Sequence, residues 1–367
     1  MEARGRGALT TLGRVGATPT GPSTMRRIEV LPRPPNVNQS MIDLSMNRWG
    51  WAVAAVACAF SVATPWASAQ QTARQIAITI DDLPANMYGG DNDDWEAMTR
   101  DLLAGLVDGA VPAIGFVNET KLYPGDARDE RRVALLQAWL DAGLELGNHS
   151  YSHPDLHNTP LAEFQIDVLR GEEVTRELLA AAGQVPRFFR HPFLHTGMSL
   201  EVRDGLHEFL AEHGYRVAPV TIDNMEYIAA RAYDHALVRT DEQLAARIAD
   251  AYVEYMDEMT GYYEQQADAL LGRPIAHTLL LHANRLNART IGRLLDDLRA
   301  RGYEFVPLEI ALEDPAYESP DEFVGRAGIT WLHRWALTAG KRGDFFGTEP
   351  NLPRFVHDVY ADPPGRR

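Results

Sequence analysis

The sequence predicts an α/β protein built from repeated strand–helix units. Short apolar segments suited to buried strands recur along residues 75–308, and amphipathic segments with a helical period separate them. Four of the amphipathic segments are followed by a glycine suited to a helix C-cap: Gly143, Gly183, Gly214 and Gly302. This alternation is typical of a parallel sheet, either closed as a barrel or doubly wound.

The elements are expected in alternating order along the chain. The expected strands are 75–80, 111–117, 144–147, 187–189, 215–222, 278–281 and 303–308. The expected helices are 94–107, 128–142, 161–182, 200–213 and 288–301. In either kind of parallel sheet, functional side chains gather where the strands end, at the carboxyl edge.

Two segments interrupt this regular pattern. Residues 240–271 predict one long helix with a stripe of Tyr and Met, which is typical of a buried face; a lid over a substrate cleft is the alternative. Residues 314–367 predict a helical extension packed on a main domain over 70–313. In that extension a helix is expected to start near Ser319, with Trp331 and Trp335 on or near one face.

The first 69 residues differ from the rest. Residues 1–45 are rich in Arg, Gly, Pro, Ser and Thr without an apolar period, so we expect disorder or a mis-assigned translation start. Residues 46–69 combine a basic start, an apolar stretch and an Ala-Ser-Ala cleavage sequence, as a secretory signal peptide does. The apolar stretch falls short of the roughly 20 residues that span a bilayer. We therefore expect a periplasmic or secreted protein without a stable membrane span after signal removal.

Composition narrows the class of protein further. The 367 residues are 45% hydrophobic, which is enough for a sizeable folded core. The formal net charge of -16 repels nucleic acid and anionic membranes, so no nucleic-acid partner is expected. The single cysteine, Cys58, lies within the expected signal peptide, so disulfide and thiol chemistry are not expected in the mature protein.

Carboxylates and imidazoles follow two of the expected strands. Asp81 and Asp82 end the first strand, and such adjacent charges persist readily where a cation or an arginine offsets them. A simple turn cap is the alternative for this pair. The segment NHSYSH places His149 and His153 four residues apart, and one helical turn there would point both rings at a shared metal. His157 continues the spacing, so the spacing alone does not decide which pair binds.

Three later strands also end in groups that could do chemistry. One Asp and two His suit Zn, Co or Ni and leave positions open for water and substrate. Arg190 ends a further strand and could orient a carboxylate of the Asp pair through a bidentate contact. Asp223 and Glu226 follow the next strand, and His282 follows another. Each group alone is more often structural, but five strand ends with such groups indicate a hydrolytic site.

The segments TIDD, HSYSH, RHPF, DNMEY and LLLH occur in this order along the chain. In type and order they resemble the motifs of the polysaccharide deacetylases of the NodB homology type, carbohydrate esterase family four. The resemblance covers roughly residues 75–308. It implies a distorted (β/α) barrel of about seven parallel strands, with the long helix inserted and the C-terminal helical segment added. It also implies hydrolysis of N-acetyl or O-acetyl groups on an acetylated polysaccharide or oligosaccharide.

The resemblance further implies a metal site and a base. One divalent ion, with Zn favoured over Co and Ni, would be held by Asp82, His149 and His153. Asp81 would act as the general base that takes a proton from the activated water. Arg190 would hold Asp81 in place.

The resemblance also assigns the remaining groups. His282 would be the general acid toward the leaving amine, and the backbone N–H of Phe193 would help to bind the oxyanion. Asp223 or Glu226 would orient His282 or Arg190. Two alternatives stay open: a metal-dependent amidohydrolase acting on a small cyclic amide or a peptide, and a non-catalytic carbohydrate-binding relative.

Overall fold

Seven parallel strands form the sheet of this protein, in a computed structural model that describes residues 74–365. The leader over 1–45 and the expected signal peptide over 46–69 lie outside the described residues. The strands are β1 (Arg74–Leu83), β2 (Ile114–Val117), β3 (Glu145–Asn148), β4 (Phe188–Phe189), β5 (Arg216–Val217), β6 (His277–His282) and β7 (Tyr303–Phe305). None of the helices within 74–365 is long and apolar enough to cross a membrane.

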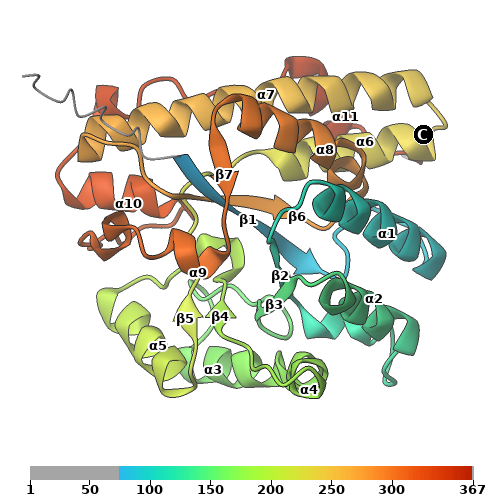
Figure 1. Ribbon diagram of the computed structural model, residues 1–367, viewed down its shortest axis with the longest axis horizontal. Helices are drawn as coiled ribbons and strands as arrows, with labels where there is room; N and C mark the ends of the chain where they lie inside the picture. Colours follow the sequence, from blue (N-terminus) through green and yellow to red (C-terminus); the bar gives the residue numbers. More distant parts are fainter. Residues whose placement is uncertain (1–73, 366–367) are drawn as a thin grey trace, which may run out of the picture. The chain divides into compact units, whose positions relative to one another are not determined.

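The sheet curls so that its two sides approach each other. Its order is β5-β4-β3-β2-β1-β6, and β7 pairs with the first residues of β1 (Figure 1). Just beyond β5 the chain reaches Ile222, which forms a parallel bridge with Leu279 of β6. This bridge joins the end of one side of the sheet to the strand on the other side. The predicted α/β class and distorted barrel of about seven parallel strands are confirmed.

Helices surround the sheet, and most lie where the sequence predicts them (Figure 1). They are α1 (Asn92–Asp108), α2 (Glu130–Asp141), α3 (Leu161–Arg170), α4 (Glu173–Ala181), α5 (Leu200–Glu212), α6 (Glu226–Val238), α7 (Glu242–Leu271), α8 (Arg285–Ala300), α9 (Leu308–Ala311), α10 (Trp331–Thr338) and α11 (Arg354–Ala361). Short 3-10 turns are η1 (Glu119–Leu122), η2 (Pro192–Leu194), η3 (Pro315–Glu318) and η4 (Gly343–Phe345). The helices α6 and α9 were not expected from the sequence, whereas α11 lies within the expected C-terminal helical extension.

The single helix expected over 161–182 is wrong, because two helices, α3 and α4, share this segment. The chain breaks between them at Gly171. A Cβ added to Gly171 would lie 2.4 Å from the backbone carbon of Ser150 and 2.4 Å from the nitrogen of Tyr151. The break therefore lets helical backbone pack directly against the HSYSH segment, which no larger residue would allow.

The helix start expected near Ser319 is also wrong. Residues 319–330 have no regular structure, and α10 begins only after Thr330, whose side chain accepts from the His333 N–H. A Cβ added to Gly328 would lie 1.8 Å from the carbonyl oxygen of Phe193. The missing side chain therefore lets this segment pack directly against the RHPF loop. In α10 itself, Trp331 and Trp335 are both buried, as the expected apolar face requires.

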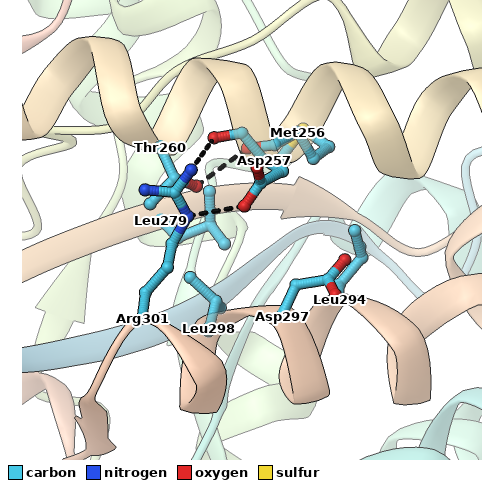
Figure 2. Close-up of a pocket in the computed structure, with 8 residues that line it drawn as sticks. All are labelled: Met256, Asp257, Thr260, Leu279, Leu294, Asp297, Leu298 and Arg301. Carbon is cyan, nitrogen blue, oxygen red and sulfur yellow. Dashed lines mark hydrogen bonds and ion pairs between the residues drawn. The ribbon is translucent and has the colours of Figure 1, made fainter.

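The stripe of Tyr and Met on α7 belongs to the core. Its buried members include Tyr252, whose hydroxyl donates to Asn287 Oδ1 of α8 over 2.8 Å. Figure 2 shows a pocket where α7 and α8 pack over β6, with Arg301 reaching across to Asp257. None of the candidate site residues lines this pocket.

Candidate active site

Asp81 and Asp82 end β1, and both carboxylates face the same histidine. Oδ2 of Asp81 is 3.8 Å from His149 Nε2, and Oδ1 of Asp82 is 3.9 Å from the same nitrogen. Neighbouring side chains on a regular strand point to opposite faces. Asp82 instead has a φ of 69°, a left-handed conformation that is costly for a residue other than glycine. This strained backbone conformation lets the Asp82 carboxylate face the same histidine as the Asp81 carboxylate.

Asp82, His149 and His153 form a group, here named the Asp82 triad, that can hold a metal ion. Asp82 Oδ1 lies 3.7 Å from His153 Nε2 and 3.9 Å from His149 Nε2. Asn86 donates to the other carboxylate oxygen over 2.7 Å, which leaves Oδ1 directed at the imidazoles. Metal–ligand distances of about 2.0–2.1 Å in a tetrahedron separate ligand atoms by roughly 3.4 Å. The two separations from Asp82 Oδ1 exceed this value by about 0.3–0.5 Å, and ligand atoms of all three residues lie within 4.8 Å of one another.

The protonation of His149 suits it to bind a metal. Its Nδ1 lies 2.8 Å from the backbone carbonyl of Arg190, which can only accept, so Nδ1 carries the proton. Burial first, and then the neighbouring His153, hold the pKa of His149 well below its usual value. The ring is therefore neutral and keeps a lone pair on Nε2. A hydrogen bond of this kind on the far nitrogen is the usual support of a metal-binding histidine.

The segment from His149 to His153 is a loop and not the helical turn that the sequence argument allowed. Ser150 and His153 have φ values of 66° and 57°. The Ser150 hydroxyl accepts from the His153 N–H over 3.2 Å. The two rings nevertheless converge, with centroids 4.8 Å apart. Convergence comes from these two left-handed residues and not from helical periodicity.

Asp167, on α3, holds this loop from behind. Its Oδ1 accepts from the backbone N–H groups of Tyr151 and Ser152, both over 2.9 Å. Its Oδ2 accepts from the Ser152 hydroxyl over 2.7 Å. The close approach at Gly171 brings the C-terminal end of α3 near enough for these contacts. Asp167 thus fixes the loop that carries His153 without belonging to the triad.

Lys121 supplies a positive charge beside the triad. Its Nζ is 3.3 Å from Asp82 Oδ1 and donates to the Asp82 carbonyl over 2.9 Å. Burial on its own would raise the pKa of Asp82, but opposing effects, led by the charge of Lys121, outweigh it and hold that pKa below its usual range. Asp82 therefore stays ionised, as a metal ligand must.

Asp81 occupies a drier position than Asp82. Only 3% of it is exposed, and burial raises its pKa to about 6, partly offset by the nearby Arg190 charge. The bidentate contact expected between Arg190 and this pair is not present. Arg190 Nε lies 3.8 Å from Asp81 Oδ1, while Nη2 donates to Thr79 Oγ1 over 2.8 Å. Arg190 acts on Asp81 through its buried charge.

His282 lies across from Asp81, because the two residues are paired in register between β1 and β6. Its Nδ1 is 2.7 Å from Glu226 Oε2, and Asn284 donates to the other oxygen of Glu226. Burial would lower the pKa of His282, but the charge and hydrogen bond of Glu226 outweigh it and raise that pKa to about 9. His282 is therefore a charged acid at neutral pH.

Glu226, and not Asp223, contacts His282. Asp223 Oδ1 accepts from the N–H of Asn224 over 2.8 Å, and burial raises the pKa of Asp223. Tyr255 of α7 accepts from the Met225 N–H over 2.9 Å, which fixes the start of α6 and so the position of Glu226. Of the two acids that the sequence left open, Glu226 is the one in hydrogen-bond contact with His282, and its orienting role stays a prediction.

Phe193 lies in η2, beside the triad. It has a φ of 57°, and its ring packs edge-on against His153 with centroids 4.4 Å apart. The side chain is 54% exposed, so this ring is open to a bound ligand. The predicted role of its backbone N–H toward an oxyanion stays a prediction.

Sequence reasoning missed several residues that support the site. Asn86, Lys121 and Asn284 all follow strand ends, so their position at the carboxyl edge was the available signal. Asp167 sits on a helix and offered no signal. His157, which continued the histidine spacing, lies apart from the Asp82 triad and groups instead with Asp155 and His195.

A hollow opens beside His282 and its partner Glu226. It is lined by mostly polar and aromatic residues from four segments of the chain, and its empty volume, which is open to solvent, is about 590 Å³. Asn86, Glu226 and Asn284 line it, which connects it to both the Asp82 triad and His282. Tyr227 and Tyr360, which are 54% and 40% exposed, contribute aromatic surface.

A protein-family model described as "Polysaccharide deacetylase" matches residues 68–218 of this chain. The match includes the segments TIDD, HSYSH and RHPF, whereas DNMEY and LLLH lie beyond it. The resemblance to polysaccharide deacetylases inferred from the motifs is confirmed over residues 68–218, which contain the first three of them.

Several solved structures are similar at low identity. Peptidoglycan deacetylase PdaC from Bacillus subtilis is 20% identical, with 66% of this chain and 92% of that chain covered and a TM-score of 0.41. A family 4 carbohydrate esterase from Streptomyces lividans in complex with acetate is 19% identical, with 63% and 90% covered and a TM-score of 0.39. A mutant, with restored enzymatic activity, of a CE4 family pseudoenzyme from Bacillus anthracis is 17% identical, with a TM-score of 0.41. That alignment covers 64% of this chain and 65% of the mutant, less than two thirds of its length.

Proposed function

We propose that this chain, whose residues 68–218 match the polysaccharide deacetylase family, is a metal-dependent deacetylase. It would remove N-acetyl or O-acetyl groups from a polysaccharide outside the cytoplasm, after export through the signal peptide expected at 46–69. The observation that carries the proposal is that a carboxylate, Asp81, and an imidazole, His282, lie at the same strand ends as the Asp82 triad. Their surroundings push the two pKa values apart, to about 6 and about 9.

A divalent ion held by Asp82, His149 and His153, with Zn favoured, would act as a Lewis acid toward water and the acyl carbonyl. Asp81 accepts the proton of the attacking water, since it is largely ionised at neutral pH and its pKa of about 6 makes it a stronger base than an ordinary aspartate. Arg190 keeps that carboxylate in place by charge across 3.8 Å.

His282 then protonates the leaving amine or alkoxide. Its pKa of about 9 keeps it charged at neutral pH, and Glu226 fixes the ring so that Nε2–H is the free donor. The N–H of Phe193, next to His153, would bind the oxygen on which negative charge develops. Each need of acyl hydrolysis is thus met by a residue at this edge of the barrel.

The hollow beside His282 favours a glycan over a small cyclic amide. A small-molecule site is expected to be an enclosed, mostly apolar cavity. Here Tyr227 and Tyr360 expose their rings at a polar hollow, which suits the stacking of a sugar face. The net charge of -16 is compatible with a neutral or cationic polymer.

We also propose that the catalytic domain spans residues 70–313 and that 314–367 form an extension packed on it. Hydrogen bonds to the barrel support the packing of the extension on it. The Trp331 N–H donates to the Val220 carbonyl over 2.7 Å, and the Tyr317 hydroxyl donates to the Ala276 carbonyl over 2.9 Å.

The test is acetate release from a panel of N- and O-acetylated glycans by tag-free protein. Wild type, Asp81→Asn and an exposed control, Asp126→Asn, are compared with Zn²⁺ added and with Zn²⁺ chelated. Release by the wild type and the control, but not by the Asp81 variant or the chelated samples, is the expected result. Unchanged release in the chelated samples or in the Asp81 variant would overturn the mechanism. Metal binding without release from any glycan would favour the carbohydrate-binding alternative.

A further inference from the structure

The hollow beside His282 has a wall that the proposed chemistry does not use. This wall is one face of α6, because its residues follow the i, i+3, i+4, i+7 spacing of a helix face. They are Tyr227, Ala230, Arg231 and Asp234. An aromatic ring, a cation and an acid are thus presented side by side to whatever enters the hollow.

Helix α11 completes the hollow with Tyr360. Contacts with α6 hold the chain on both sides of this residue. His235 Nδ1 lies 3.0 Å from the Val359 carbonyl, and Arg239 donates to Asp362 Oδ2 over 2.9 Å. Tyr360 therefore belongs to a fixed wall of the hollow, although it lies close to the C-terminus.

Two acids line the hollow, and both are already bonded. Asp234 accepts from the Tyr88 N–H over 2.7 Å with one oxygen and from Arg285 over 3.1 Å with the other. One oxygen of Glu226 is 2.7 Å from His282 Nδ1, and the other accepts from a side-chain amide. Each carboxylate oxygen thus has a partner, so neither acid is a ready site for a positively charged ligand group.

Arg231 is the cation of the hollow, and it differs from the two acids. Within the part of the chain that the structure describes, its guanidinium forms no ion pair and lies over the Tyr88 ring, 4.7 Å from the ring centroid. A guanidinium presents a planar fork of N–H donors that matches a carboxylate. The formal charge of -16 does not oppose this locally, because exposed charges more than about 8–10 Å away are largely screened at physiological salt.

We propose that the hollow binds a sugar unit that carries a carboxylate. Arg231 bonds to the carboxylate, while Tyr227 and Tyr360 pack against the apolar face of the sugar ring. The preferred substrate is therefore an acidic glycan, in which acetylated units neighbour units of the uronic-acid type.

The unit in the hollow lies next to the unit that reacts. Asn86 lines the hollow and donates to Asp82 of the Asp82 triad over 2.7 Å. The helices α6 and α11 both lie beyond residues 68–218, so the preference for an acidic glycan comes from elements outside the family match. The choice of an acetylated substrate rests on the deacetylase activity proposed above, whereas binding of an acidic sugar in the hollow does not.

Calorimetric titration tests the binding without catalysis. The acidic probe is a tetramer of β-1,4-linked glucuronic acid, and cellotetraose is the matched neutral probe, in which each carboxylate is replaced by a hydroxymethyl group. Neither has an acyl group to be hydrolysed. We expect tag-free full-length protein to bind the acidic probe about 5-fold more tightly than the neutral one.

Variants assign the preference to the hollow. Arg231→Gln should bind the two probes about equally, and Tyr360→Ala should weaken the binding of both. Arg100→Gln, which changes an exposed arginine outside the hollow, should keep the preference of the wild type. Equal affinities in the wild type, no measurable binding of either probe, or a preference retained in Arg231→Gln would overturn the proposal.

Two features guard the test against variants that do not fold. The preference is a ratio of two affinities measured on one preparation, so a fraction of unfolded protein does not change it. In the wild type alone, the preference should shrink as sodium chloride is added, because salt screens the ion pair. A preference that does not respond to salt would also contradict the role of Arg231.

Acetate release then separates this proposal from the proposed function. The substrates are oligosaccharides of N-acetylglucosamine alternating with glucuronic acid, and the same oligosaccharides after reduction of their carboxylates to alcohols. Arg231→Gln should lower the ratio of kcat/KM for the acidic form over the reduced form by about 5-fold. Acidic-probe binding without acetate release from any glycan would refute the deacetylase and leave the hollow as a sugar site. Release at equal kcat/KM from both forms in the wild type would refute the preference and leave the deacetylase.

Discussion

Replacing Asp167 by Ala should weaken metal binding at the Asp82 triad, although Asp167 touches none of its members. Asp167 accepts three hydrogen bonds from Tyr151 and Ser152, in the loop between His149 and His153. Those bonds hold a loop in which Ser150 and His153 have left-handed φ values of 66° and 57°. Without the carboxylate, the loop is free to leave that conformation and carry His153 away.

The size of the effect follows from the contacts that are lost. The Tyr151 N–H also donates to the Asp167 backbone carbonyl over 3.1 Å and keeps that acceptor. Hydrogen bonds at a part-exposed site contribute about 1 kcal/mol each, so the variant should lose about 2 kcal/mol of unfolding free energy. Each left-handed residue costs roughly 1–2 kcal/mol, and without the Asp167 hydrogen bonds this cost favours other conformations of the loop. A metal ion that binds the relaxed loop must restore this conformation, and loss of such outer support typically lowers metal affinity by about 10–100-fold.

Competition against a chromogenic zinc chelator measures the affinity, and urea unfolding of the metal-free protein measures the stability. Glu163→Ala, an exposed acid on the same helix, is the matched control. Asp167→Asn keeps an acceptor for the two backbone N–H groups and should fall between the wild type and Asp167→Ala. If Asp167→Ala lost stability but bound zinc as tightly as Glu163→Ala, the loop would not depend on this carboxylate for its bound shape.

Three further predictions concern other parts of the molecule. Glu226→Gln should move the alkaline limb of the kcat/KM profile down by about 1–2 pH units, because the charge that raises the pKa of His282 to about 9 is removed. Gly328→Ala should lower unfolding free energy by about 1–3 kcal/mol, since the new methyl group meets the Phe193 carbonyl. Burial lowers the pKa of His277 to about 3, so only the unfolded chain binds this proton between pH 6.5 and 3. Unfolding free energy should fall as pH falls through that range, by about 2 kcal/mol from pH 7 to 5, and His277→Asn should remove this part of the fall in urea titrations.

Each of these predictions has an outcome that contradicts it. An alkaline limb that stays near pH 9 in Glu226→Gln would show that another group sets it. Gly292→Ala is the control for Gly328→Ala, because nothing lies within 4 Å of its added Cβ in α8, and it should gain up to about 1 kcal/mol. Equal changes in the two glycine variants would disprove the clash. An unaltered loss of stability between pH 7 and 5 in His277→Asn would assign the acid sensitivity to other buried histidines.

The strands and their carboxyl-edge residues could be predicted from the sequence for a physical reason. Buried parallel strands must be apolar on both faces, so a run such as Ile76 to Ile80 followed by Asp81 marks both a strand and its functional end. Pairing of β1 with β6 then places Asp81 opposite His282. The order of the motifs therefore predicts which strand-end residues lie close together, even where the side-chain geometry is unknown.

The partner of His282 could not be predicted in this way. Asp223 and Glu226 follow the same strand, and either acid is near enough in sequence to reach the ring. The choice depends on where α6 begins, which the hydroxyl of Tyr255 helps to fix from α7 by accepting from Met225. Tyr255, 30 positions from Met225, thus influences which carboxylate contacts His282, and the sequence near the two acids does not predict that contact.

The sequence also could not predict which of His149, His153 and His157 share a site. Equal spacing favours three equivalent ligands only if the backbone repeats, and positive φ at Ser150 and His153 breaks the repetition. After the second of these bends, the ring of His157 stacks on the ring of His195, which lies in the loop after Phe193. The spacing alone therefore did not show that His157 lies apart from His149 and His153. Because backbone conformation separates His157 from the other two, we expect His153→Gln to weaken zinc binding at the Asp82 triad and His157→Gln to leave it unchanged.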